Sequence, residues 1–408
     1  MRNQGIIVAG VRELLRNRLS PFRHRHFRNF FLAQTLSLVG SWSHDLARAW
    51  IVVSATGSSG ALGNINTALA VPCLFLILQG GVLVDRADVR KLLMWTKTLL
   101  GISGIVLALL TETSEIQIWH LMIFAVIEGV IVSFDSPAFQ ALTVRLVPRA
   151  EFQAAIALNS TNFHSSRMLG PVIAAWLMNI HGPGLVFMFD AVTYFLVAVV
   201  LSRVELDVRP AINKERKRLR DGLRYIANHP QIRFRVMQLM LTIAVVFPLT
   251  ISVFRVFIQT KFNLDAHEFG YVFSLIAIGS MAGALTFAVV QPKEPEKALF
   301  YGVPLVIAML LVMPFMPTLM TTVTAMGLSG YGLYLTFASL TVSMHLTVED
   351  EYRGRLGSVI GLAFSSIGPL MSFPWGHMAD YLGTANAIVA SGLIFGVGSA
   401  ILALGARH

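Results

Sequence analysis

The segment that decides the organisation of this chain reads Gly81-Val82-Leu83-Val84-Asp85-Arg86-Ala87-Asp88-Val89-Arg90-Lys91. It separates two apolar stretches, residues 61–84 and 91–111, and the first of them contains no Lys, Arg, Asp or Glu. A helix that crosses the hydrocarbon layer needs about 20 mostly apolar residues, because lipid offers the backbone no hydrogen-bond partners. We therefore interpret the charged part of this segment as a connection between two membrane-spanning helices.

The same alternation of apolar stretches and polar connections continues along the whole chain. Hydrophobic residues make up 55% of the 408 residues and charged residues only 13%, which is not the balance of a water-facing surface. The prediction is an all-α membrane protein with twelve transmembrane helices. Six expected spans form the first half, near residues 30–54, 61–84, 91–111, 117–140, 154–180 and 183–201. Six more form the second half, near residues 234–259, 268–291, 298–316, 318–347, 355–379 and 384–405.

Positive residues indicate which side of the membrane each connection faces. Of the 32 Lys and Arg residues, 27 fall in or beside the N-terminal arm, the even-numbered connections and the C-terminus, whereas the opposite side carries only Lys261. Because Lys and Arg are retained on the cytoplasmic side, we expect both termini and the long central connection in the cytoplasm. We expect no nucleic-acid partner, since that role requires basic residues gathered on a folded, water-facing surface.

The chain divides into two related halves. A short Leu-Thr-Val sequence followed by a Gly-Pro pair occurs in residues 142–171 and again in residues 346–369. Two pseudo-symmetric six-helix bundles place a binding site between them, near the middle of the membrane. The expected divisions are a basic cytoplasmic arm with a surface helix (1–29), an N-terminal bundle (30–201), a basic cytoplasmic linker (202–233) and a C-terminal bundle (234–408).

Residues 81–91 resemble the signature loop of the major facilitator superfamily, which implies a transporter with an inner gate. The resemblance assigns the gate to Gly81, Asp85, Arg86, Arg90 and Lys91. Physically, the glycine permits close helix approach, the carboxylate accepts hydrogen bonds from a helix N-terminus, and the basic side chains bind carboxylates in one conformation only. The alternative is a solvated loop that fixes the topology.

Residues 157–175 are similar to the glycine-rich sequence of antiporters in the same superfamily. The matching positions are Ser166, Gly170, Pro171 and Ala174. Small residues at this spacing allow tight helix packing, so packing without directional meaning is an alternative explanation. Further segments resemble the secretion-effector and drug-antiporter branch, whose members include enterobactin exporters and macrolide efflux pumps. This resemblance implies an exporter in a bacterial inner membrane, and a monomer is the usual state in the family.

Ionisable side chains inside the expected spans are candidates for proton coupling or cargo binding, because each costs about 2.5–3.5 kcal/mol to insert and needs a partner, water or a function. They are His44, Asp45, Arg48, Glu128, Arg167 and Asp190. Asp45 and Arg48 lie three residues apart on one helix face and can pair. Glu128 lies midway along its span, where burial favours a protonated carboxyl group. A buried pair with Arg167 would instead keep it charged.

Other charged residues are expected close to water. Lys97 and Arg255 are placed near enough to span ends for their side chains to reach the interface. Asp190 is expected nearer the outer face, and Asp135 and Asp380 near span ends. We therefore rank these three carboxylates below Asp45 and Glu128.

These patterns predict a secondary active transporter that works by alternating access and exports small amphiphilic molecules, such as drugs, siderophores or lipid-like compounds, driven by protons and without a bound cofactor. The main alternative is an importer of a small solute, proton-coupled or facilitative. A metal-ion exporter, which would need His44, Asp45 and His377 to converge, and a non-transporting sensor are weaker alternatives. An enzyme is not expected, because the sequence shows neither zinc-ligand spacing nor a nucleophile motif, and Cys73 stands alone.

Overall fold

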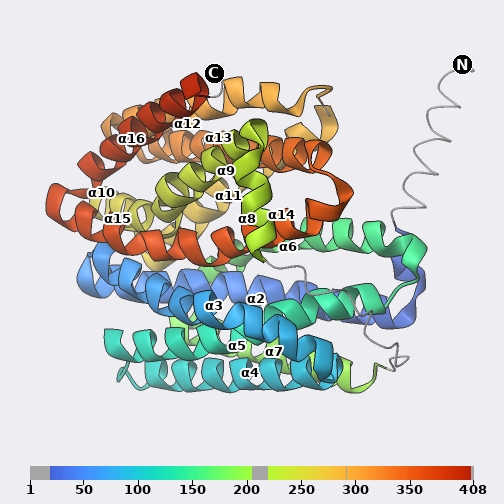
Figure 1. Ribbon diagram of the computed structural model, residues 1–408. Helices are drawn as coiled ribbons and strands as arrows, with labels where there is room; N and C mark the ends of the chain where they lie inside the picture. The colour runs from blue at the N-terminus through green and yellow to red at the C-terminus, as the bar shows by residue number, and fades with distance from the viewer. Residues whose placement is uncertain (1–18, 205–218, 291, 406–408) are drawn as a thin grey trace, which may run out of the picture.

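The computed structural model describes residues 19–204, 219–290 and 292–405, and helix is the only regular secondary structure in these ranges (Figure 1). Two groups of helices lie one above the other in this view, with the helices running across it. The N-terminal group contains α2 (Arg25–Thr56), α3 (Ser59–Arg86), α4 (Val89–Glu112), α5 (Ile118–Arg145), α6 (Phe152–His181) and α7 (Pro183–Ser202). The short η1 (Ser20–Arg23) precedes α2, and η2 (Arg149–Glu151) precedes α6.

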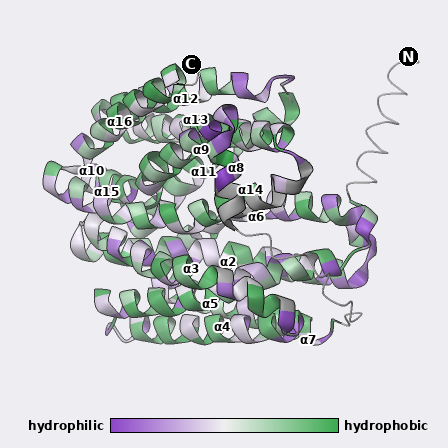
Figure 2. Cartoon of the chain, in the orientation of Figure 1, coloured by the Kyte–Doolittle hydropathy of each residue, from purple (hydrophilic) through white to green (hydrophobic). Residues whose placement is uncertain are grey.

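The C-terminal group is built from more interrupted helices. One rod comprises α9 (Pro230–Leu241), η3 (Thr242–Val246), η4 (Leu249–Val253) and α10 (Phe254–Phe262), and another comprises α14 (Asp350–Leu362), η7 (Ala363–Ile367) and α15 (Gly368–Leu382). The remaining helices are α8 (Leu219–Asn228), α11 (Ala266–Val290), η5 (Pro295–Ala298), α12 (Leu299–Val312), η6 (Met313–Phe315), α13 (Leu319–Thr347) and α16 (Thr384–Gly405). Hydrophobic residues predominate along most helices, whereas hydrophilic residues mark α8 (Figure 2).

Three long helices are more polar than the other spans, and they line the space between the groups. In the part of the chain that the structure describes, nine helical segments are long and apolar enough to cross a membrane. The other long helices are α2, α6 and α13, with 32, 30 and 29 residues. Together with the nine they make twelve long helices, which confirms the predicted all-α membrane architecture. Their polarity fits their position, because each carries residues of the central pocket described below.

Consecutive helices reverse direction at two faces of the molecule. We call the end with the α2–α3 turn at Gly57 and Ser58 the Ser58 face, and the end with the α3–α4 connection the Asp88 face. The Ser58 face has tight reversals: Gly57 (φ 59°) ends α2, and Gly182 (φ 76°) alone separates α6 from α7. A side chain is disfavoured at such φ values, which explains glycine at both turns.

The hydrophobic core joins the two groups at the Ser58 face and splits into separate cores toward the Asp88 face. One cluster contains residues of both groups, such as Leu46 and Phe187 from the first and Phe254 and Phe269 from the second. A second cluster contains N-terminal residues only, around Leu142 and Val197. A third contains C-terminal residues only, around Leu340 and Leu356. The two groups therefore share a core at one end and have separate cores at the other.

Close backbone contact reinforces the joined end. A Cβ atom at Gly63 of α3 would collide with the carbonyl oxygen of Ser372 in α15, and one at Gly376 of α15 would collide with the carbonyl oxygen of Ser59. On the other side of the interface, a Cβ atom at Gly270 of α11 would collide with Ala175 of α6. Small residues thus let α3 and α6 approach the opposite group as closely as backbones permit.

Widened helical turns occur in both interrupted rods. The segments η3, η4 and η7 are π-helical, and Pro248 lies between the first two. The widened turns pack together: the rings of Phe247 and Phe364 are 4.6 Å apart, and the indole of Trp375 donates a hydrogen bond of 2.9 Å to the carbonyl of Ala244. Such turns are frequent at functional sites, and Arg255 follows η4 by two residues.

Candidate functional site

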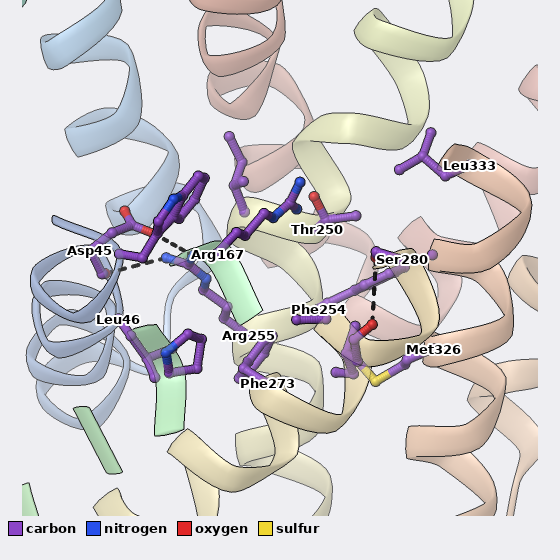
Figure 3. Close-up of a pocket in the computed structure, with 16 residues that line it drawn as sticks. Asp45, Leu46, Arg167, Thr250, Phe254, Arg255, Phe273, Ser280, Met326 and Leu333 are labelled. Carbon is purple, nitrogen blue, oxygen red and sulfur yellow. Dashed lines mark hydrogen bonds and ion pairs between the residues drawn. The ribbon is translucent and has the colours of Figure 1, made fainter. Parts of the chain in front are cut away.

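A pocket lies between the two groups of helices, and both groups supply its wall (Figure 3). Its cavity volume is about 60 Å³. Most of the wall is apolar or aromatic, and three charged side chains belong to it: Asp45 of α2, Arg167 of α6 and Arg255 of α10. The other lining residues are Trp42, Leu46, Pro171, Thr250, Ile251, Phe254, Phe273, Ile276, Ala277, Ser280, Met326, Gly330 and Leu333.

Asp45 connects the two groups through an ion pair. Its Oδ2 atom accepts a hydrogen bond of 2.5 Å from Nη2 of Arg255, and its Oδ1 atom accepts one of 3.1 Å from Nη2 of Arg48. The predicted pair within α2 is therefore confirmed. The expectation that Arg255 reaches the membrane interface is wrong, because its side chain is buried against Asp45 and the ring of Phe273.

Glu128 of α5 pairs with Arg48 rather than with Arg167. The distance between Nη1 of Arg48 and Oε2 of Glu128 is 2.9 Å, and both side chains are buried. Arg48 thus stands between two carboxylates, one on its own helix and one on α5. The alternative pairing of Glu128 with Arg167 is wrong. Arg167 lies in the wall of the pocket, and the carboxylate of Glu128 forms its ion pair with Arg48.

His44 and Asp190 continue the chain of charges away from the pocket. The Nδ1 atom of His44 lies 2.9 Å from Oδ2 of Asp190, and its Nε2 atom lies 3.4 Å from Oε1 of Glu128. Asp190 is only 1% exposed, and it is the eighth of the 20 residues of α7, in the half of that helix nearer the Ser58 face. The imidazole of His44 is therefore hydrogen-bonded to Asp190 and lies within ion-pair distance of Glu128.

These side chains form one alternating series across the molecule. In order they are Asp190, His44, Glu128, Arg48, Asp45 and Arg255, from helices α7, α2, α5 and α10. Burying an unpaired ion is costly, and each carboxylate here has a cationic or titratable neighbour. Adding a proton at one carboxylate weakens its hold on the next cation, so a local protonation can act on the pair between the two groups.

Arg167 is half-buried and is placed differently from the buried cations Arg48 and Arg255. Among the residues that the structure describes, no carboxylate forms an ion pair with its guanidinium, which instead lies 5.3 Å from the ring centre of Trp42 and 5.1 Å from that of Tyr334. Aromatic faces attract a cation but do not neutralise it. Arg167 therefore brings a positive charge to the wall of the pocket.

A second buried ion pair lies within the N-terminal group, away from the pocket wall. Nζ of Lys97 donates to Oδ2 of Asp135 over 2.9 Å, and the hydroxyl of Thr96 donates to Oδ1 over 2.7 Å. Lys97 and Asp135 are both buried. The expectation that both reach water near span ends is therefore wrong, because these two positions face each other between α4 and α5.

The antiporter-like positions of α6 lie at its contact with α2. A Cβ atom at Gly170 would collide with Trp42, and the carbonyl of Gly170 accepts a hydrogen bond of 2.8 Å from Ser43. Ala174 is fully buried and Pro171 lines the pocket. The hydroxyl of Ser166 points to Thr35 of α2, 3.4 Å from its carbonyl oxygen. The spacing of small residues thus brings α6 against α2 and Arg167 into the pocket.

The signature-loop residues lie at the Asp88 face. Asp88 accepts hydrogen bonds from the backbone of Arg90 and Lys91 and caps α4, and the guanidinium of Arg90 donates to the carbonyl of Val204 over 2.7 Å. A Cβ atom at Gly81 would meet nothing within 4 Å, so the expected close approach does not occur there in this conformation. It occurs one residue earlier, where Gly80 packs on α5. Arg86 is exposed, and the Asp85 side chain is outside the described parts.

His377 does not join His44 and Asp45. It lies on α15 near the Ser58 face, where its Nε2 atom is 2.9 Å from Oδ1 of Asn64. The neighbouring Asp380 accepts hydrogen bonds from the hydroxyl of Ser58 and from the amides of Ser59 and Gly60. Within the described residues, no group of three His, Cys, Asp or Glu could hold a metal ion. These contacts tie the two groups together instead.

Known transporters resemble this chain, two of them along most of its length. The Staphyloferrin A transporter of Staphylococcus aureus is 23% identical over 381 residues, which cover 89% of this chain and 92% of that protein. The multidrug efflux pump Tap of Mycolicibacterium fortuitum is 23% identical over 364 residues, covering 85% and 88%. Macrolide efflux protein A of Streptococcus pyogenes is 23% identical over 180 residues, or 44% of each chain.

Solved transporter structures share the fold. A bacterial homolog of the human lysosomal transporter Spinster, in an inward-facing and occupied conformation, superposes with a TM-score of 0.73 at 15% identity, covering 95% of this chain and 97% of that one. The nucleoside transporter NupG superposes with a TM-score of 0.68 at 15% identity, covering 94% and 98%. A family model described as transmembrane secretion effector matches residues 16–406. A match over almost every described helix shows that this chain belongs to the transmembrane secretion effector family of major facilitator transporters.

Proposed function

We propose that this protein exports small amphiphilic molecules from a bacterial cytoplasm in exchange for protons, by alternating access. The observation that carries the proposal is the Asp45–Arg255 ion pair, which joins the two groups of helices in the wall of the central pocket. Export is favoured over import because the curated relatives include a macrolide efflux protein and multidrug efflux pumps. The amphiphilic character of the cargo follows from a wall of aromatic and aliphatic side chains that also presents charge.

The orientation in the membrane is part of the proposal. The distribution of Lys and Arg assigns the Asp88 face, both termini and the linker to the cytoplasm. The separate cores lie toward this face and the shared core toward the Ser58 face, which supports a pocket that opens to the cytoplasm in this conformation. Cargo would then enter from the cytoplasm before the Ser58 face opens.

The buried series of charges provides a route by which proton uptake changes the contact between the two groups of helices. A proton taken up by Glu128 releases Arg48 from one carboxylate, and Arg48 can then bind Asp45 more strongly. Asp45 in turn holds Arg255 less tightly. A proton on Asp45 itself removes the charge that attracts Arg255. In either case the attraction between the two groups weakens at the pocket, which links proton uptake to their relative movement.

The test is transport in inside-out membrane vesicles with an imposed pH gradient, acidic inside. The cargo panel comprises macrolides, siderophores and lysophospholipids, and the variants are Asp45→Asn and Glu128→Gln. We expect gradient-dependent uptake of at least one compound by the unaltered protein and its loss in both variants. Asp265→Asn is the matched control, because Asp265 lies outside the pocket, directly before α11, and Asn also accepts backbone hydrogen bonds. Uptake that is indifferent to the gradient would refute proton exchange, and uptake only in right-side-out vesicles would establish import.

A further inference from the structure

The pocket wall contains more positive than negative charge. Its three charged residues are two arginines and one aspartate, and the aspartate is already shared between Arg48 and Arg255. Arg167 therefore has no carboxylate of its own in the described chain, although it lies inside the protein at the level of the pocket. A cation held in such a place needs a counter-charge, and the pocket is where one can enter.

Arg255 has unused hydrogen-bonding capacity at the same place. Its Nη2 and Nη1 atoms point to Asp45, over 2.5 Å to the carboxylate and 3.5 Å to the backbone carbonyl. The remaining donor, Nε–H, is buried without a hydrogen-bond partner, and the residue as a whole is only 6% exposed. A guanidinium presents donors along two edges, and a buried donor without an acceptor costs roughly 1–3 kcal/mol. An incoming acceptor would remove this cost.

From these two arginines we propose that the cargo carries an acidic group, and that Arg167 and Arg255 together bind it. The ligand chemistry is an oxyanion, such as a carboxylate, sulfonate or phosphate, because its oxygens accept paired hydrogen bonds from guanidinium. The apolar part of the same molecule packs on Phe254 and Phe273, which line the pocket near the arginines (Figure 3), and on Trp42, whose ring centre lies 5.3 Å from the guanidinium of Arg167. The inference rests on the proposed export function and specifies the class of cargo.

The anion site also explains how cargo binding would affect the contact between the groups. An oxyanion that binds Arg255 competes with Asp45 for the same guanidinium. Arg167 belongs to α6 of the N-terminal group and Arg255 to α10 of the C-terminal group, so one acidic group would bridge the two halves in place of Asp45. Asp45 would then be free to accept a proton, since its strongest cationic partner is engaged elsewhere.

The experiment measures binding to the full-length protein in a nonionic detergent, without a pH gradient. The probes are three acids and their neutral amides: 2-naphthoate, 1-pyrenebutyrate and dansylglycine. We expect at least one acid to bind about tenfold or more tightly than its amide, a difference of about 1.4 kcal/mol. Arg167→Gln should abolish this preference, Arg167→Lys should keep part of it, and Lys261→Gln should keep all of it, because Lys261 is exposed outside the pocket.

Each result separates this inference from the proposed function. If no acid binds more tightly than its amide, or if folded Arg167→Gln keeps the preference, the anion site is wrong. Should Arg167→Gln fail to fold, the comparison of acid with amide on the unaltered protein and on Arg167→Lys still decides. Acid preference with gradient-independent flux would overturn proton exchange alone, and gradient-driven flux of neutral compounds only would overturn the anion site alone.

Discussion

At the scale of single residues, the buried charges form a connected system in which no member can be altered in isolation. Asp45 satisfies Arg48 and Arg255 at once, and Arg48 satisfies Asp45 and Glu128. Removing one member leaves a charged neighbour in a poorly hydrated site, which costs more than removing an exposed pair. The consequence is that single and paired replacements should differ in a characteristic way.

We predict that Asp45→Asn lowers the free energy of unfolding by about 3 kcal/mol, because it leaves Arg255 and Arg48 without their shared carboxylate. Adding Arg255→Gln should recover part of the lost stability, since the second change removes one of the two cations left without a partner. The measurement is a double-mutant cycle from thermal unfolding in detergent. Additive effects of the two changes would show that the ion pair contributes nothing.

The pair of Lys97 and Asp135 provides the matched control. It is a buried ion pair with an Nζ–Oδ2 distance of 2.9 Å, but neither residue lines the pocket. We predict that Lys97→Met combined with Asp135→Leu keeps both stability and gradient-driven transport, since apolar residues of similar size often replace a buried ion pair without loss. Loss of transport in a stable double variant would assign this pair a role in coupling.

At the scale of elements, contact between α3 and α15 depends on glycine at points where the backbones meet. We predict that Gly63→Ala forces these helices apart and destabilises the closed Ser58 face, because its Cβ atom would collide with the backbone of Ser372. Gly361→Ala is the control, since a Cβ atom there meets nothing within 4 Å. The readout is alkylation of a cysteine introduced at Asn64 in a Cys73→Ser background. Equal labelling in both glycine variants would contradict the prediction.

The helices could be predicted from sequence, but most of the contacts between them could not. The length of an apolar stretch is enough to predict helices such as α3 and α16. The spacing of Asp45 and Arg48 is enough to predict their ion pair within α2. Arg255 lies 210 residues from Asp45, and its partner depends on the depth and rotation of two separate rods. The widened turns before Arg255 shift that rotation, and the length of an apolar stretch does not indicate them. For this reason the sequence predicts Arg255 too near water.

At the scale of the whole molecule, the proposed alternating access requires the Ser58 face to open, whereas the structure holds that face closed through contacts between α3 and α15. We predict that a disulfide between Asn64→Cys and His377→Cys, in a Cys73→Ser background, blocks transport until it is reduced. The two native side chains meet at 2.9 Å, so the positions are adjacent in the closed state. The measurement is flux before and after a reductant. Undiminished flux in the fully cross-linked protein would refute opening at this face.

The divided hydrophobic core has a mechanical consequence. As long as the Ser58 face stays closed, the two arms share a core there and have separate cores at the Asp88 face, so they rotate about the shared end. A small rotation there displaces the far tips most, while each arm keeps its own packing. Spin labels near Arg145 and Gly357, on opposite arms at the Asp88 face, should therefore report the largest change in separation during a transport cycle.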